Sequence, residues 1–359
     1  MTEHATKVGT NTYRERILKE LNLPENHFRE FLGLKFSSLG MGTYLGELDS
    51  KTDKLVTNAV IDSVKGGVNI IDTAINYRLQ KAERSIKKAL KSVKRRGFER
   101  NQYFISTKVG YIPGDADLGL NARSYIQEVL LKENIITRNE IIGMNCMSSS
   151  YLKHQITQSL KNLGVNCIDL LYLHNVADAQ KKVLGEERFY IKLKEAFELL
   201  ENLIAQKKIQ YYGIATWDCL RVPPSSPVHL DIQHTFELAS KAANAQGKNE
   251  SGFKFFMLPF NFLMPEAINL QNQDGKTVFQ KAQELELGLF AAVPLMQARS
   301  LGHPKLRPFM EKMDVDTAAQ AALQFVRNIG IPLIAPLVGH KQPAHVRENL
   351  SLLLLPPDS

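Results

Sequence analysis

Short apolar runs with the composition of β-strands recur eight times along this chain, and each is followed by a segment with a helical pattern. Near-continuous apolar strands that alternate with helices are typical of a parallel sheet buried on both faces. Strands are expected at residues 38–42, 68–72, 103–108, 168–174, 210–215, 255–260, 287–293 and 332–338. Helices are expected after the first four strands at residues 52–67, 80–93, 151–163 and 188–206.

The number of strand–helix units decides between two common architectures. Eight units fit a closed (β/α)8 TIM barrel, whereas an open doubly wound sheet usually has about five or six strands. A single α/β barrel domain can also account for all 359 residues. We therefore predict an N-terminal extension over residues 1–34, with some helix around 12–21, followed by a barrel over residues 35–359.

One connection departs from the regular rhythm. Residues 110–149 follow the third strand and form a βα connection far longer than the usual few residues. Such a connection lies at the C-terminal face of a barrel, where these folds keep their active sites. The insertion is therefore either a lid that shapes substrate choice or an ornament. Shorter insertions follow later strands at 221–231 and 246–252.

The composition excludes some functions. Hydrophobic residues make up 44% of the chain and charged residues 23%, which is ordinary for a globular protein and argues against disorder. The net charge of +8 would suit an anionic partner, either nucleic acid or the phosphates of a dinucleotide, and charge alone does not choose between them. Because the basic residues are scattered, we predict no nucleic-acid partner. The densest basic run is interpreted as a solvated helix face: Lys87, Lys88, Lys91, Lys94, Arg95 and Arg96.

Neither targeting signals nor metal-binding spacings are visible. The start of the chain has no apolar signal segment, and no apolar stretch approaches the roughly 18 residues of a membrane span. Cys146, Cys167 and Cys219 are isolated from one another and lack CxxC spacing. We expect reduced thiols, no metal and no membrane contact in a cytoplasmic protein.

Four chemically active side chains are predicted to meet at one rim of the barrel. Asp72, Lys108 and His174 end the second, third and fourth strands, and Tyr77 follows Asp72 in the next loop. A polar residue at the C-terminal end of a barrel strand is more often catalytic than structural. Taken singly, Asp72 could cap its loop and His174 could be a polar strand end. Together the four predict an active site.

These residue types fit the reduction of a carbonyl group, which needs a hydride on carbon and a proton on oxygen. A tyrosine hydroxyl has an ordinary pKa of about 10. An ammonium at about 4 Å favours the phenolate by roughly 4 kcal/mol at an effective dielectric near 20, before desolvation opposes it. Lys108 is thus expected to bring Tyr77 toward the working pH, with Asp72 holding Lys108 and a neutral His174 orienting the carbonyl oxygen.

The same residues carry a resemblance to a known family. The segment from Asp72 to Tyr77, DTAINY, with Glu83 resembles the DTAxxY…E pattern of the aldo/keto reductases. STK ending at Lys108 and DLLYLH ending at His174 are similar to two further motifs of that family, as is MGTY at 41–44. VG at 338–339 and VREN at 346–349 resemble its cofactor segment. The resemblance runs from about residue 34 to 350 and implies NADPH, less often NADH, with Tyr77 as the proton donor.

The cofactor-binding residues follow partly from the resemblance and partly from departures. Where the family usually has Ser-Asn after the fifth strand, this chain has Ala215-Thr216 followed by Trp217; Met257 and Ala292 replace a glutamine and an aromatic residue. His345 replaces an arginine, so Lys341, His340 and His345 are expected to supply positive charge to a 2′-phosphate. We expect the cofactor-binding residues to be Gly42, Thr43, Tyr44, Asp72, Thr216, Trp217, Gly339, His340, Lys341, His345, Glu348 and Asn349.

Three hypotheses remain for function. The first is an NAD(P)H-dependent oxidoreductase that reduces an aldehyde or ketone. The second is a cofactor-binding but non-catalytic regulatory or scaffolding barrel, which the altered nicotinamide contacts and the long third loop suggest. The third keeps the site but uses it for dehydrogenation or for an acid/base step. Residues 110–149, Trp217 and the segment around Arg299 are expected to govern the substrate, whose identity the sequence does not give.

Overall fold

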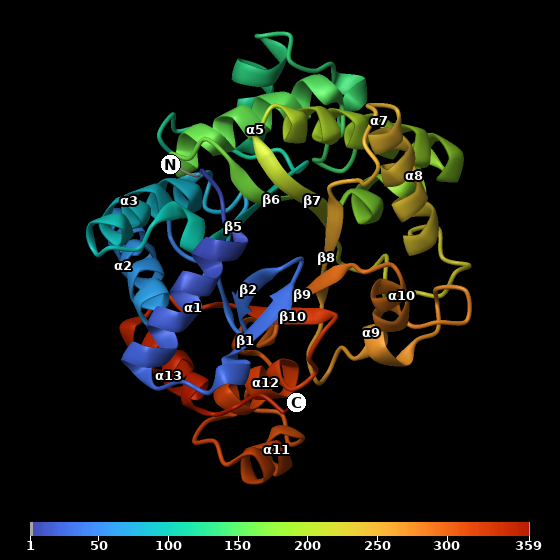
Figure 1. Ribbon diagram of the computed structural model, residues 1–359. Helices are drawn as coiled ribbons and strands as arrows, with labels where there is room; N and C mark the ends of the chain where they lie inside the picture. Colours follow the sequence, from blue (N-terminus) through green and yellow to red (C-terminus); the bar gives the residue numbers. More distant parts are fainter. Residues whose placement is uncertain (1–2, 359) are drawn as a thin grey trace.

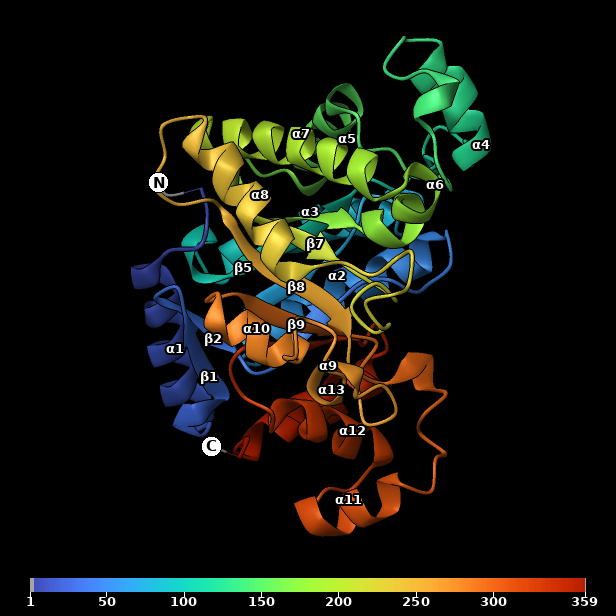
Figure 2. The same ribbon diagram turned by 90° about the vertical axis from the view of Figure 1, so that its right-hand side faces the viewer.

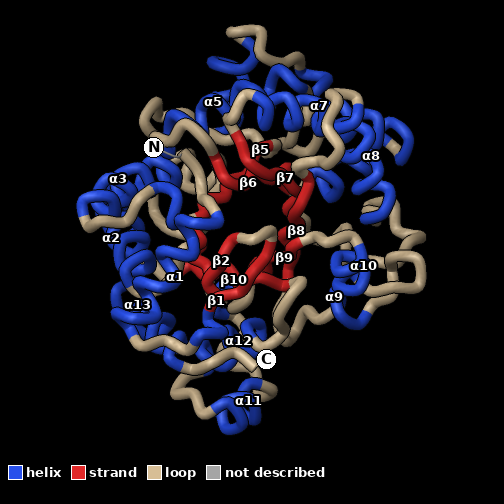
Figure 3. The backbone as a smooth tube through the Cα atoms, in the orientation of Figure 1, coloured by secondary structure: helices blue, strands red, loops and turns tan. Residues whose placement is uncertain are grey.

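The computed structural model describes residues 3–358 and contains a closed barrel of eight parallel strands. Figure 3 shows these strands as a ring that is surrounded by helices. The strands pair in the order β10-β3-β4-β5-β6-β7-β8-β9. Their bounds are β3 Gly40–Gly42, β4 Ile70–Asp72, β5 Phe104–Val109, β6 Ile168–His174, β7 Ile209–Ala215, β8 Phe253–Pro259, β9 Gly288–Ala292 and β10 Leu333–Gly339.

The predicted (β/α)8 fold is therefore confirmed. Each expected strand is present, and its ends differ from the prediction by at most two residues. Every residue of β5 and β6 is buried, as expected for strands whose two faces are covered by the barrel interior and the outer helices.

Helices cover the outside of the ring, as Figures 1 and 2 show from two sides. The four helices that the sequence predicts are present with small shifts at their ends, and four more follow the later strands. Asp49 illustrates how one of them begins, because its carboxylate accepts the backbone N–H of Thr52 at the start of α2. The main outer helices are α2 Ser50–Lys65, α3 Lys81–Arg95, α5 Ser149–Leu163, α7 Glu186–Ala205, α8 Ile232–Asn244, α10 Val278–Glu284, α12 Ala318–Arg327 and α13 Pro343–Ser351. Three short helices, α6 Lys182–Leu184, α9 Glu266–Asn269 and α11 Leu306–Met313, lie in the connections.

The N-terminal segment closes one end of the barrel. It contains α1 (Lys7–Leu21), which the sequence predicts in part, and an antiparallel hairpin of β1 (Phe28–Phe31) and β2 (Leu34–Ser37), which it does not. Phe36 packs edge-to-face on Phe104, the first residue of β5, with ring centroids 5.0 Å apart. The hairpin thus covers the N-terminal end of the strands and leaves the C-terminal rim open. The boundary expected at residue 34 falls within this hairpin, while residues 1, 2 and 359 lie outside the described part.

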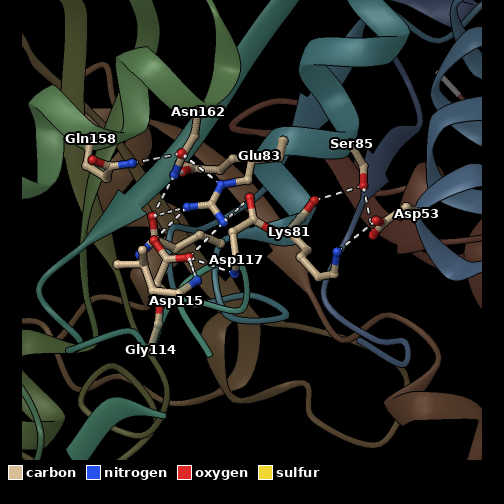
Figure 4. A network of polar contacts seen from close by, with 12 residues as sticks. Asp53, Lys81, Glu83, Ser85, Gly114, Asp115, Asp117, Gln158 and Asn162 are labelled. Carbon is tan, nitrogen blue, oxygen red and sulfur yellow. Dashed lines mark hydrogen bonds and ion pairs between the residues drawn. The ribbon is translucent and has the colours of Figure 1, made fainter. Parts of the chain in front are cut away.

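The insertion 110–149 is a folded unit rather than an open loop. It contains α4 (Ala122–Tyr125), a π-helical turn (Ile126–Leu131) and a small apolar core of its own. Arg84 on α3 holds it to the barrel through two hydrogen bonds of 2.8 and 2.7 Å to the carboxylate of Asp115. Figure 4 shows the polar network around Asp115. The amide of Gln80 adds a bond to the carbonyl of Gly114.

Other expectations concern the surface and the cysteines. The three cysteines are buried and free. Within residues 3–358, no helix combines the length and the apolar character that crossing a membrane requires. The basic residues at the end of α3 are mostly exposed: Lys88, Lys91, Lys94, Arg95 and Arg96.

Candidate active site

The strand register brings the predicted catalytic residues to one rim. Asp72 ends β4 and lies opposite Gly42 of β3 and Ser106 of β5. Lys108 lies opposite Tyr172 in β6, and His174 ends β6. Because parallel strands start and end together, the side chains at these ends converge on the C-terminal mouth of the barrel.

Asp72 and Lys108 form a buried ion pair at the base of this mouth. The Lys108 Nζ lies 2.6 Å from Asp72 Oδ2 and also donates to the carbonyl of Thr73 at 2.7 Å. The hydroxyl of Ser106 donates to the other carboxylate oxygen at 2.7 Å. Burial opposes the charge on Lys108, but the Asp72 carboxylate and Tyr77 outweigh it and raise the pKa of Lys108. Lys108 is therefore an ammonium at neutral pH.

Tyr77 lies beside this pair, but its pKa moves in the direction opposite to the sequence-based prediction. The Lys108 Nζ is 4.9 Å from the centroid of the Tyr77 ring. Burial raises the pKa of Tyr77, and the Lys108 ammonium lowers it by less, so the net shift is upward. The expectation that Lys108 brings Tyr77 toward neutral pH is wrong for this structure, because desolvation of the phenolate is the larger effect. Tyr77 carries a proton across the neutral range.

His174 is neutral and faces two aromatic rings. Its ring centroid is 6.0 Å from that of Tyr77 and 5.0 Å from that of Tyr111. Burial and the nearby Lys108 ammonium lower the pKa of His174 well below its ordinary value. Its Nδ1 is buried without a hydrogen-bond partner, and a buried lone pair costs less than a buried orphan N–H. These facts favour the tautomer with the proton on Nε2.

A single large cavity unites the predicted residues. It has a volume of about 810 Å³ and is lined by all four predicted catalytic residues and all of the predicted cofactor-binding residues. At the rim it meets β3 to β6, and it runs past β9 and β10 to the N-terminal ends of α12 and α13. The residues that the sequence predicts for catalysis and for cofactor binding therefore lie around one cavity in the folded chain.

The far end of the cavity is suited to an anion. Lys341 and His345 line it, and α13 begins there with an N-cap residue, Gln342, that makes no side-chain capping bond. The first backbone N–H groups of a helix lack intrahelical partners and carry part of the helix dipole, so they favour a phosphate. The donor set at this end fits the phosphates of a dinucleotide.

His340 does not share that role. Its Nε2 lies 2.7 Å from the hydroxyl of Ser63, and its Nδ1 lies 3.1 Å from the amide of Asn349. Burial lowers the pKa of His340 to about 4, so the ring is uncharged at neutral pH. The expectation that His340 supplies positive charge to a phosphate is therefore wrong. Glu348 is likewise engaged, since it accepts the hydroxyl of Thr317 at 2.6 Å.

The β7–β9 side of the mouth offers few polar groups. The Thr216 hydroxyl donates to the carbonyl of Met257 at 2.9 Å, so its proton is already used. Met257 and Ala292 line the cavity there and supply no donor or acceptor from their side chains. Trp217 also lines the cavity, with 42% of its surface exposed.

Some lining residues are not singled out by the sequence-based prediction. Tyr111 is expected only as part of the insertion 110–149, and Asn175 is not expected at all. Both follow the ends of strands, β5 and β6, so the rule that identifies strand-end residues could have included them. The loop 293–301 also lines the cavity, as expected for the segment around Arg299, but its positive φ angles at non-glycine residues such as Val293 and Gln297 are not predicted. No sequence signal marks that conformation, because glycine and asparagine are its usual carriers.

Comparison with known proteins agrees with this geometry. A family model described as the aldo/keto reductase family matches residues 38–224, which is more than half of the chain. The chain belongs to the aldo/keto reductase family. It is therefore an oxidoreductase by family.

Solved structures of similar fold bear the same family description. An aldo/keto reductase from Klebsiella pneumoniae, solved with NADP and acetate, is 17% identical; the match covers 89% of this chain and 87% of that one, with a TM-score of 0.59. The holo form of an aldo-keto reductase from Bacillus halodurans is 18% identical, with 92% of each chain covered and a TM-score of 0.61. At these identities the likeness is one of fold.

Proposed function

We propose that this protein uses NADPH to reduce the carbonyl group of an aldehyde or ketone, with Tyr77 as the proton donor. One observation carries the proposal. A protonated Tyr77, a buried Lys108–Asp72 pair and a neutral His174 line the same cavity whose other end fits phosphate. Bound NADPH would supply the hydride.

The chain's own residues have separable roles. The Tyr77 hydroxyl holds the proton that the carbonyl oxygen needs, and the Lys108 ammonium beside the ring stabilises the phenolate that remains. Asp72 keeps Lys108 charged and in place through the 2.6 Å contact. His174, with its proton on Nε2, donates a hydrogen bond that orients the oxygen.

The preference for NADPH over NADH rests on the end of the cavity at α13. Lys341 and His345 lie beside the uncapped N-terminus of that helix, where a 2′-phosphate would meet the Lys341 ammonium, the His345 imidazole and backbone N–H groups. Relatives of the same fold were solved with NADP. An adenosine without the phosphate would gain nothing from these groups, so NADH is expected to bind more weakly.

Charge along the cavity also narrows the substrate. Among the described lining residues, acidic and lysine side chains occur in two groups: the Asp72–Lys108 pair, and Lys341 and Glu348 near α13. At the mouth the lining is mostly aromatic, with Tyr44, Tyr111 and Trp217. Without a free cation there to hold a carboxylate or phosphate, the mouth suits an uncharged carbonyl compound.

The test is a screen of uncharged aldehydes and ketones followed by NADPH oxidation, with Tyr77→Phe beside wild type. Loss of the hydroxyl is expected to lower kcat about 10²–10⁴-fold, the range of general acid catalysis. Tyr125→Phe is the matched control, because Tyr125 lies in the insertion and bonds His154, away from the cavity. Full activity of Tyr77→Phe on a substrate that wild type reduces would refute the proposed role of Tyr77.

One observation favours a second candidate. The side of the mouth formed by Thr216, Met257 and Ala292 offers few polar groups to hold a nicotinamide amide. A barrel that binds the cofactor without catalysis does not need to hold the nicotinamide in place, so this feature fits a non-catalytic role. That alternative predicts NADPH binding without turnover across the screen, together with a stable complex with a partner protein.

A further inference from the structure

A short π-helical turn joins the two loops that flank the candidate active site. It covers Ala177–Lys181 and begins three residues after His174, so it belongs to the same connection as that residue. π-Helical turns are rare and often occur at functional sites. Asp178 points from this turn to the loop that follows β7.

The contact is made by one carboxylate and three successive backbone amides. Asp178 Oδ2 accepts the N–H of Trp217 at 3.0 Å. Asp178 Oδ1 accepts the N–H of Asp218 at 2.6 Å and that of Cys219 at 2.9 Å. Only an ionised carboxylate has enough acceptor capacity for three such bonds without also presenting a donor. Charge-assisted bonds of this kind are stronger than neutral ones.

The same turn also holds the far end of that loop. Lys181 Nζ donates to the carbonyl of His229 at 2.5 Å, and the N–H of Leu230 bonds to the carbonyl of Cys219 at 3.0 Å. The connection from β7 to α8, which contains the insertion 221–231, is thus hydrogen-bonded to the π-helical turn at both of its ends. Trp217 lies at the first of these two ends.

The Trp217 side chain is only partly packed against the protein. Its side chain lines the cavity and 42% of the residue is exposed, and within residues 3–358 it makes no contact with another aromatic ring. The position of the ring therefore depends on the backbone that Asp178 fixes. A half-exposed indole held at a cavity mouth can stack on a flat apolar group at low entropic cost.

We propose that Asp178 is a positioning residue: it fastens the Trp217 loop to the His174 loop and so fixes the indole that grips a flat, aromatic portion of the substrate. The part of this inference that concerns substrate rests on the proposed function. Its structural part, the fixed position of Trp217, does not. The two parts can therefore be tested separately.

The spectroscopic test uses the fact that Trp217 is the single tryptophan of the chain. In Asp178→Asn the amide nitrogen would face backbone N–H groups, so at least one of the three bonds is lost. Steady-state anisotropy of Trp217 is expected to fall and acrylamide quenching to rise about twofold or more, with and without NADPH. Asp218→Asn is the matched control: it removes the same charge one residue away from Trp217, from a side chain that is 56% exposed and pairs with Arg221. It is expected to behave as wild type.

The kinetic test separates positioning from general damage. In Asp178→Asn, KM for benzaldehyde is expected to rise about tenfold while kcat changes little, and KM for propanal, which has no ring to stack, is expected to change less than about twofold. An equal loss for both aldehydes would overturn the substrate part. Wild-type anisotropy and quenching in Asp178→Asn would overturn the positioning role.

Two further outcomes remain informative. If wild type reduces no carbonyl compound but Trp217 is loosened in Asp178→Asn, the proposed function fails and the positioning role stands. If Asp178→Asn does not fold, time-resolved anisotropy of wild-type Trp217 decides: a ring that tumbles only with the whole protein supports the inference, and a dominant nanosecond local motion overturns it.

Discussion

The two sides of the barrel mouth differ in the polar side chains that they offer and in how those side chains are hydrogen-bonded within the protein. On the β4–β6 side, Ser106 and Lys108 both donate to the carboxylate of Asp72 within the protein itself. On the β7–β9 side, Met257 and Ala292 present no polar side chain, and the proton of Thr216 is donated to the backbone. The β4–β6 side is preorganised for proton transfer. The β7–β9 side offers few polar groups for a cofactor, so cofactor binding depends mainly on the end of the cavity near α13. Proton chemistry and cofactor binding should therefore respond to different mutations.

The largest effect is expected from breaking the preorganised side. Lys108→Met removes the ammonium beside Tyr77, and kcat/KM for a carbonyl substrate should fall about 10³-fold. It also leaves the Asp72 carboxylate buried and unpaired, which should lower the free energy of unfolding by about 3–5 kcal/mol in urea titrations. Lys194→Met, which removes a half-exposed lysine that pairs with Glu198 on α7, is the matched control. A loss of less than tenfold would show that Lys108 does not act on Tyr77.

The pH profile tests the same side without a mutation. Tyr77 must be protonated to donate, and burial raises its pKa above the ordinary 10.0, so the reduction rate should stay constant up to that pH. Beyond the raised pKa it should fall about tenfold per pH unit as the phenolate forms. His174 has a pKa below its ordinary 6.5 and so adds no change above that pH. Initial rates at saturating NADPH would measure this, and a break between pH 7 and 9 would contradict the raised pKa of Tyr77.

A smaller effect is expected from the insertion that supports His174. The amide of Asn145 donates to the backbone carbonyl of His174 at 2.9 Å and accepts from Gln180 at 2.7 Å. Asn145→Ala should lower kcat/KM about three- to tenfold and stability by about 1–3 kcal/mol, since both partners are buried. Asn121→Ala removes only a local helix cap within the same insertion and serves as the control. Equal effects of the two would mean that the insertion matters only through its own stability.

The smallest effect should come from adding a polar side chain to the β7–β9 side of the mouth. Met257 is 4% exposed and lines the cavity, so Met257→Gln would offer an amide to the nicotinamide. NADPH is expected to bind about threefold more tightly, the gain of roughly one partly compensated hydrogen bond. Isothermal titration calorimetry would measure it. Unchanged affinity would show that the lack of polar groups on this side does not limit binding.

The sequence predicts those parts of the site that depend on strand register. Asp72, Lys108 and His174 each end a strand, and the ends of parallel strands meet at one rim whatever the rest of the chain does. The hairpin β1–β2 escapes prediction because its four-residue strands turn through Leu32 and Gly33 with no strong turn signal at Leu32.

Burial and long-range contacts are what the sequence does not reveal. His340 is neutral because the fold buries its ring, with Nε2 against the Ser63 hydroxyl on α2. The upward shift of the Tyr77 pKa likewise arises from burial in the folded barrel. Asp178 reaches amides some 40 residues ahead in the chain. Such effects need the packed structure, because motifs record which residue types are present but not how far each is desolvated.

Titration of the protein with NADPH, followed through Trp217 fluorescence, tests most directly whether the two ends of this cavity form one cofactor-dependent active site. We expect micromolar NADPH binding, weaker NADH binding, and at least about tenfold weaker NADPH binding in the double variant Lys341→Ala, His345→Ala, because the phosphate loses the Lys341 ammonium and the His345 imidazole. NADH binding should be almost unchanged in that variant. No detectable binding of either nucleotide to the wild-type protein would contradict the account, since the intact proton-transfer residues would then lack a hydride source in this cavity.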